Sequence, residues 1–162
     1  MERTQGAMRQ VYEVANFVRT IRRRLRFGEF SRAPIQIMRL ELRGDFAECD
    51  WMTRPPDLWD SRVPLSARNE SSSQQALADA MAMRHLLLGE LPHIRGAALR
   101  AFRPSDFGAP DVIIAGTILR EDPYLLRIPS PVMRAKLCGF RFELENGFLK
   151  PLRRDDCSLT SQ

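Results

Sequence analysis

The sequence predicts an α+β fold: a two-layer sandwich in which a mainly antiparallel sheet of about six strands has helices packed on one face. Three observations support this class. Apolar and polar residues alternate over 34–54 and again near the carboxyl end, as in half-buried strands. Apolar residues recur every three or four positions in two other stretches, as in amphipathic helices. Short turn signals join the neighbouring strands, which favours antiparallel pairing.

The chain divides into three parts on this basis. Residues 1–28 form an amphipathic amino-terminal helix that belongs to the same domain or is an appendage to it. Residues 34–152 form the α+β core domain, and residues 153–162 have no periodicity and are predicted to be a frayed tail. A chain of this length holds one ordinary domain with a core of its own.

The first helix is predicted over about Gln5 to Phe27. Its apolar stripe consists of Val11, Val14, Ala15, Val18, Ile21 and Leu25. Its last turns carry Arg19, Arg22, Arg23, Arg24 and Arg26. Their positive charges interact favourably with the negative end of the helix dipole. Gly28 lies where a left-handed residue would end the helix.

The stretch 34–54 predicts a β-hairpin that turns at Gly44 and Asp45. One face of this hairpin is apolar and consists of Ile35, Ile37, Leu40, Leu42, Ala47, Cys49 and Trp51. Glu48 and Asp50 fall on the opposite face, where neighbouring acids provide solubility more often than catalysis. The second strand must end before Pro55 and Pro56, because proline cannot continue a central strand.

A second, central helix follows the polar stretch 69–75. There Ser71 or Ser72, with Gln74 or Gln75 three residues later, fits a capping box and predicts the start of the helix. Its buried side is predicted to contain Leu77, Ala80, Met81, Leu87, Leu88 and Leu91, and Gly89 and Pro92 end it. We expect this helix to pack across the apolar face of the hairpin.

The remaining elements are two strands, a short helix and a last hairpin. The strands are predicted over 97–102 and 111–120. Ser130 and Pro131 are typical of the start of a helix that Gly139 would end. Asn146-Gly147 is the strongest two-residue hairpin signal in the chain.

Composition bounds the compartment and the cofactors. The three cysteines, Cys49, Cys138 and Cys157, form no C-x-x-C pair, so we expect a reducing compartment, no disulfide framework and no structural zinc. No long apolar run and no signal-like segment are present, and we expect a cytoplasmic protein without cofactor or metal. The formal net charge is +5, yet only Lys136 and Lys150 are lysines, so a GC-rich genome explains the arginines as well as selection for phosphate does.

Few residues are candidates for a functional site. The arginines of the first helix predict a solvated helix end, an anion-binding or nucleic-acid-binding site, or a membrane-surface helix. Trp59, in a loop bounded by prolines, is expected either to fold over the core or to contact a partner. Cys49 and His85 could form a catalytic pair if the central helix crosses the hairpin, although an inward cysteine is more often a small hydrophobe. Asp57 and Asp60 lack the further ligands that a metal needs.

Three functions follow. We favour a non-enzymatic protein-interaction or self-assembly module that associates through the first helix or a sheet edge. The alternative is binding of nucleic acid or an acidic surface through Arg19 to Arg26. The third is a small-molecule enzyme or ligand-binding domain with a pocket between helix and sheet. The partners left open are a second copy of the chain, nucleic acid, a membrane surface and a small molecule.

Overall fold

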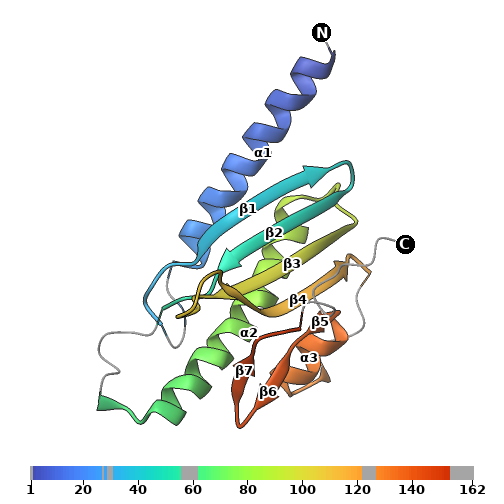
Figure 1. Ribbon diagram of the computed structural model, residues 1–162. Helices are drawn as coiled ribbons and strands as arrows, with labels where there is room; N and C mark the ends of the chain where they lie inside the picture. The colour runs from blue at the N-terminus through green and yellow to red at the C-terminus, as the bar shows by residue number, and fades with distance from the viewer. Residues whose placement is uncertain (1, 27, 29–30, 56–61, 122–126, 154–162) are drawn as a thin grey trace.

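The structure is a computed structural model that describes residues 2–26, 28, 31–55, 62–121 and 127–153. Three helices and seven strands follow one another along this part of the chain (Figure 1). In chain order they are α1 (Glu2–Arg24), β1 (Gln36–Arg43), β2 (Phe46–Met52), α2 (Leu65–Glu90), β3 (Gly96–Arg103), β4 (Asp111–Leu119), α3 (Pro131–Leu137), β5 (Phe140–Arg141), β6 (Glu143–Glu145) and β7 (Phe148–Lys150).

The predicted class is confirmed, because the protein is α+β with a mainly antiparallel sheet. Five strands form one sheet in the order β1-β2-β3-β4-β5, and β6 pairs with β7 in a separate two-stranded sheet. The one parallel pair of the main sheet is β2 with β3. Helix α2 connects these two strands, and a helical crossover is what places consecutive strands parallel. The sheet is therefore mixed, with β1 as an edge strand.

The β1–β2 hairpin is confirmed, and its register explains an irregularity in the sequence. Leu40 pairs with Cys49 and Leu42 pairs with Ala47. The register shifts between Ile37 and Arg39, so one extra residue of β1 is accommodated in a bulge. The bulge lets Ile37 and Leu40, three residues apart in the sequence, contribute to the same apolar face. Figure 1 shows the hairpin at the upper edge of the sheet, beside α1.

Helix α2 begins at Leu65, earlier than the capping box predicted. Pro64 precedes it, and no side chain caps its first turn. The polar residues of the predicted box lie within the helix instead, where Gln75 donates a 2.9 Å hydrogen bond to Asp79 one turn later. The neighbouring Ser73 hydroxyl accepts a 2.9 Å hydrogen bond from the Leu149 N–H, so this polar stretch contacts β7 rather than capping the helix.

Helix α1 joins the core with only its carboxyl half. Phe17 and Ile21 are each 1% exposed, whereas every residue from 3 to 12 is exposed. Figure 1 shows that this first half extends past the end of the sheet. The prediction that Val11 belongs to the buried stripe is wrong, since Val11 is 69% exposed. Gly28 does not have the positive φ expected of a left-handed helix stop.

The carboxyl-terminal elements largely follow the prediction. Ser130 caps α3, because its hydroxyl accepts a hydrogen bond from the Met133 N–H. Asn146 and Gly147 have φ values of 52° and 78°, the left-handed turn that their sequence predicts between β6 and β7. The single strand expected from Phe140 onward is split into β5 and β6, and only β5 pairs with the main sheet.

Candidate binding groove between α1 and β1

The predicted arginines are exposed at the end of α1 and line one wall of a groove. Four of them, Arg19, Arg22, Arg23 and Arg26, border this groove, and we call these four the arginine row. Spacings of three, one and three residues place them on one side of the helix. Arg24, the fifth predicted residue, is exposed but does not line the groove.

The other wall and the floor of the groove are mainly apolar and come from three segments that are separate in sequence: α1, residues 33–40 and Pro55. The groove encloses about 1190 Å³. Its uncharged lining consists of Val14, Val18, Ala33, Pro34, Ile35, Gln36, Ile37, Met38, Leu40 and Pro55. We call it the α1–β1 groove. An apolar floor with a row of cations along one rim suits a partner that is itself both apolar and anionic.

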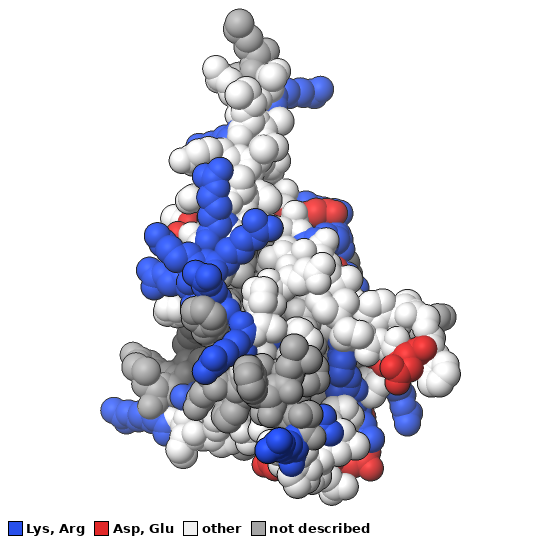
Figure 2. All heavy atoms as spheres, turned by 90° about the vertical axis from the view of Figure 1, so that its left-hand side faces the viewer, with Lys and Arg blue, Asp and Glu red and all other residues white. Residues whose placement is uncertain are grey.

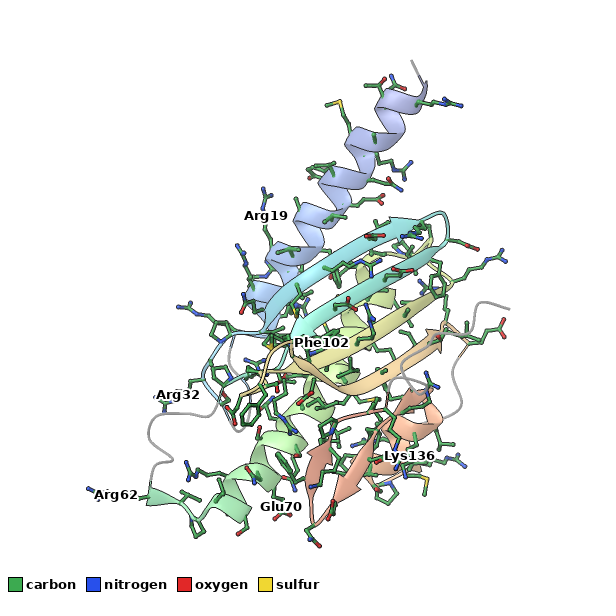
Figure 3. All side chains as sticks on the ribbon, in the orientation of Figure 1. Arg19, Arg32, Arg62, Glu70, Phe102 and Lys136 are labelled. Atoms are coloured by element: carbon green, nitrogen blue, oxygen red, sulfur yellow. The ribbon has the colours of Figure 1, made fainter. Side chains whose placement is uncertain are left out.

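The arginine row carries one sign of charge. Arg19, Arg22 and Arg23 form no ion pair or hydrogen bond within the described part of the chain. Figure 2 shows lysine and arginine side chains gathered over the carboxyl half of α1 on the face turned to the viewer. In Figure 3 Arg32 and Arg62 lie on the same side of the molecule as Arg19. Unpaired arginines that remain hydrated on one face attract anions.

Arg39 of β1 is the fifth arginine that lines the groove. It belongs to an ionic network on the open face of the sheet. Arg39 pairs with Glu41, Glu48 and Asp50. The hydrogen bond to Glu41 raises the pKa of Arg39 above its ordinary value. Asp50 is also held by two hydrogen bonds from Arg100, of 2.8 and 2.6 Å. The two acids of β2 are therefore paired with arginines, and Asp50 is only 6% exposed, so it does not have the solvent-exposed position that a role in solubility needs.

A buried arginine fixes the position of α1 and so the shape of the groove. Arg54 donates two hydrogen bonds to Asp79 of α2, at 2.8 and 3.1 Å. Its other donors reach the carbonyl oxygens of Leu25, Arg26 and Ala33, at 2.8, 3.5 and 2.6 Å. All five N–H groups of the guanidinium are thus used. Because these carbonyls follow α1 and lead toward β1, Arg54 holds both walls of the groove to α2.

The acid that pairs with Arg54 depends on it for its charge. Asp79 is 4% exposed, and burial raises the pKa of its carboxyl above the ordinary value. The hydrogen bonds from Arg54 and Gln75 oppose that effect. No local pattern in the sequence indicates this pair, because Arg54 and Asp79 are 25 residues apart.

The candidate catalytic groups do not converge. Cys49 is fully buried, and burial raises the pKa of its thiol to about 12, so the thiolate is disfavoured. His85 is exposed on α2, and Arg84 donates a hydrogen bond to the Leu119 carbonyl. Neither the α1–β1 groove nor a smaller hollow of about 270 Å³ beside β5 and β6 is lined by Cys49, Arg84 or His85.

The described residues contain neither a cluster of metal ligands nor a helix that could span a membrane. No group of three or more histidine, cysteine or acidic side chains there could hold a metal ion. The Nε2 atom of His93 lies 3.6 Å from the Oε2 atom of Glu13 on α1. No helix in the same part of the chain combines the length and apolarity that crossing a membrane requires. Trp59, Asp57 and Asp60 lie outside the described residues, as does the predicted tail beyond residue 153.

One candidate surface was missed in the sequence. We call residues 3–12 of α1 the arm, and Met8, Val11 and Tyr12 on it are 72%, 69% and 69% exposed. The missed signal is that α1 has two apolar faces, one with Phe17 and Ile21 in the core and one with these three residues. A single stripe drawn through all apolar positions merges the two.

Comparison with known proteins gives no family assignment. The chain matches no protein-family model, no curated protein and no solved structure. The groove, the arginine row and the arm are therefore the basis for a proposal of function.

Proposed function

We propose that this protein is a non-enzymatic interaction module that binds a protein partner through the α1–β1 groove. The observation that carries the proposal is the juxtaposition of an apolar floor with three arginines, Arg19, Arg22 and Arg23, that have no counter-ion within the described part of the chain. In this proposal the helices and the sheet act as a two-layer scaffold, and the edge of the sheet is the surface that binds the partner. The partner is a segment with both apolar and acidic side chains.

The experiment uses two labelled synthetic peptides with acidic and apolar residues, one designed as an amphipathic helix and one with strict alternation for an extended strand. Binding is followed by fluorescence anisotropy. Met38 lines the groove and is 47% exposed, so Met38→Glu places a negative charge there at little cost in stability. The matched control is Met133→Glu on α3, where the methionine is 51% exposed and outside the groove.

We expect at least one peptide to bind, Met38→Glu to weaken that binding about tenfold or more, and Met133→Glu to leave it within about twofold. If neither peptide binds, or if both variants bind them like the parent protein, the proposal is wrong.

Self-association is the form of this function that the arm supports. Met8 and Ala15 are one heptad apart, and Ala15 is one heptad from Arg22, so the exposed apolar side of the arm continues into the groove wall. A second copy could therefore lie along α1. Light scattering should show a discrete dimer that Val11→Glu converts to monomer, while Leu119→Glu, at a residue 60% exposed on β4, has no effect. A parent protein that stays monomeric at every accessible concentration removes self-association.

Nucleic-acid binding is the second candidate, and the one-signed surface in Figure 2 favours it. Its signature is salt dependence: the logarithm of the binding constant for duplex DNA falls with the logarithm of salt concentration by about 0.9 per phosphate contact. The combined variant Arg22→Ala, Arg23→Ala and Arg24→Ala should weaken binding and flatten that slope. Absent or salt-independent binding excludes this candidate.

A further inference from the structure

The α1–β1 groove runs along the open edge of a strand. Consecutive side chains of a strand point to opposite faces, so a groove that touches one face is lined by every second residue. Here six consecutive residues, 35–40, line the groove. The groove therefore follows the edge of β1, where the backbone itself is accessible. β1 has only β2 as a neighbour in the five-stranded sheet, so this edge is not paired within it.

One hydrogen bond shows which backbone groups face the groove side of the strand. The Gln10 side chain of α1 donates to the Leu42 carbonyl at 3.2 Å, so this carbonyl points away from β2. Backbone direction repeats every second residue in an antiparallel strand, and the N–H and C=O of one residue point the same way. Leu40 therefore presents both groups to the groove. Apart from pairing with β2, the backbone of 36–40 has no hydrogen-bond partner within the described part of the chain.

The charge of the groove selects the chemistry of an added strand. Five arginines and no acid are among the residues that line it. The strand β1 carries Arg39 and Arg43 against one acid, Glu41, so a second copy of β1 would add net positive charge to a groove that is already positive. An acidic segment from another protein has the complementary charge. The bulge between Ile37 and Arg39 limits pairing to short runs on either side of it, which restrains indiscriminate sheet extension.

The dimensions of the groove agree with an extended segment. The six residues from 35 to 40 span about 17 Å at strand rise. Side chains on one face of a strand repeat about every 7 Å, and successive turns of α1 present arginines about every 5 Å, a difference that flexible arginine side chains accommodate. Alternate apolar side chains of such a segment would contact Val18 and Ile37 on the floor.

We infer that the edge of β1 accepts an extended acidic segment of a partner protein, which adds to the sheet next to β1 with alternate side chains on the apolar floor and against the arginine row. This inference rests on the proposed function and specifies the conformation and charge of the partner segment. Main-chain hydrogen bonds to Leu40 supply part of the affinity, and the arginines supply the selectivity.

The test compares four labelled peptides on the full chain: alternating valine and glutamate, the same alternation with lysine in place of glutamate, the acidic amphipathic helix, and the valine–glutamate peptide N-methylated at every second residue. N-methylation removes the donors that pair with β1 and leaves the side chains intact. Arg22→Glu is the groove variant, and Arg3→Glu on the arm is its matched control, since Arg3 is exposed on the same helix but outside the groove.

We expect the valine–glutamate peptide to bind best. N-methylation on the edge-facing residues, lysine for glutamate, and Arg22→Glu should each weaken it about tenfold or more, and Arg3→Glu should change it by less than about twofold. Hydrogen exchange of the Leu40 amide should slow when the peptide is added, because that amide gains an acceptor. Binding of the N-methylated peptide with unchanged affinity and unchanged exchange at Leu40 overturns strand addition.

The outcomes also separate this inference from the proposed function. If the acidic helix binds more tightly than the alternating peptide and Met38→Glu abolishes that binding, strand addition is wrong and the groove remains the partner-binding surface. If no peptide responds to either Met38→Glu or Arg22→Glu, both the inference and the proposed function are wrong.

Discussion

The side chain of Arg54 is 1% exposed and donates five hydrogen bonds, whereas Arg19, Arg22 and Arg23 are exposed and pair with no residue that the structure describes. The two sets lie close together in the fold, since Arg54 binds the carbonyl oxygen of Leu25, two residues after Arg23. Near the carboxyl end of α1, one guanidinium group is therefore buried and fully hydrogen-bonded, and three others are exposed and unpaired within the described residues.

This difference shows that arginines in such a sequence can have either a structural role or a role in binding. A buried charge is retained only when it is paired and hydrogen-bonded, because removing it from water costs several kcal/mol. Arg54 satisfies that condition through Asp79 and backbone carbonyls, and so has a structural role. Exposed arginines cost the fold little and contribute little to it. Arg19, Arg22 and Arg23 pair with no residue that the structure describes and are therefore available to a partner. The two sets should respond oppositely to mutation.

The largest effect is expected at the buried pair. Asp79→Ala leaves the guanidinium of Arg54 buried without its counter-ion, so the free energy of unfolding should fall by about 3–5 kcal/mol. Urea denaturation measures this. The control is Asp45→Ala, which removes an exposed ion pair with Arg95 of 3.6 Å and should cost less than about 1 kcal/mol. Equal losses in the two variants would mean that Arg54 does not hold α1 to α2 as described.

Local patterns of the sequence were sufficient for the elements and insufficient for their tertiary contacts. The β1–β2 hairpin and the turn at Asn146 were predicted because alternation and turn chemistry act within a few residues. The partners of Arg54 are 21 to 29 residues away in the sequence, so no local pattern shows them. The start of α2 was misplaced because Ser71 and Ser72 look the same in the sequence whether they cap a helix or lie inside one.

The candidate site was half predictable for the same reason. A run of arginines at a helix end is visible in the sequence, and four of the five predicted arginines do line the groove. The groove itself exists only because β1 lies beside α1, an arrangement that depends on the order of strands in the sheet. Likewise, Phe17 and Val11 are both apolar, and only the fold shows that one is in the core and the other is exposed on the arm.

A smaller effect on stability is expected at the arginine row, with a large effect on binding. The double variant Arg22→Ala and Arg23→Ala removes exposed side chains and introduces the residue with the highest helix propensity, so the free energy of unfolding should stay within about 0.5 kcal/mol of the parent value. The same variant should lose its affinity for the acidic peptide. Urea denaturation and anisotropy on one preparation separate the two quantities. A loss of stability comparable to that of Asp79→Ala would place the row among the structural arginines and remove the contrast.

The smallest effect concerns a half-buried acid between two arginines. Hydrogen bonds from Arg39 and Arg43 lower the pKa of Glu41 to about 2 in the folded protein. Because this value is below that of the unfolded chain, about 4.3, the contribution of Glu41 to stability is present above pH 4.3 and is lost as the pH falls toward 2. NMR titration of the Glu41 carboxyl measures the folded value directly. Arg43→Ala should raise it toward 4.3, whereas Arg95→Ala, at an exposed arginine outside this network, should leave it unchanged. An ordinary pKa for Glu41 in the parent protein would show that Arg39 and Arg43 do not stabilise its charged form. The contrast with Arg54 would then be one of burial alone.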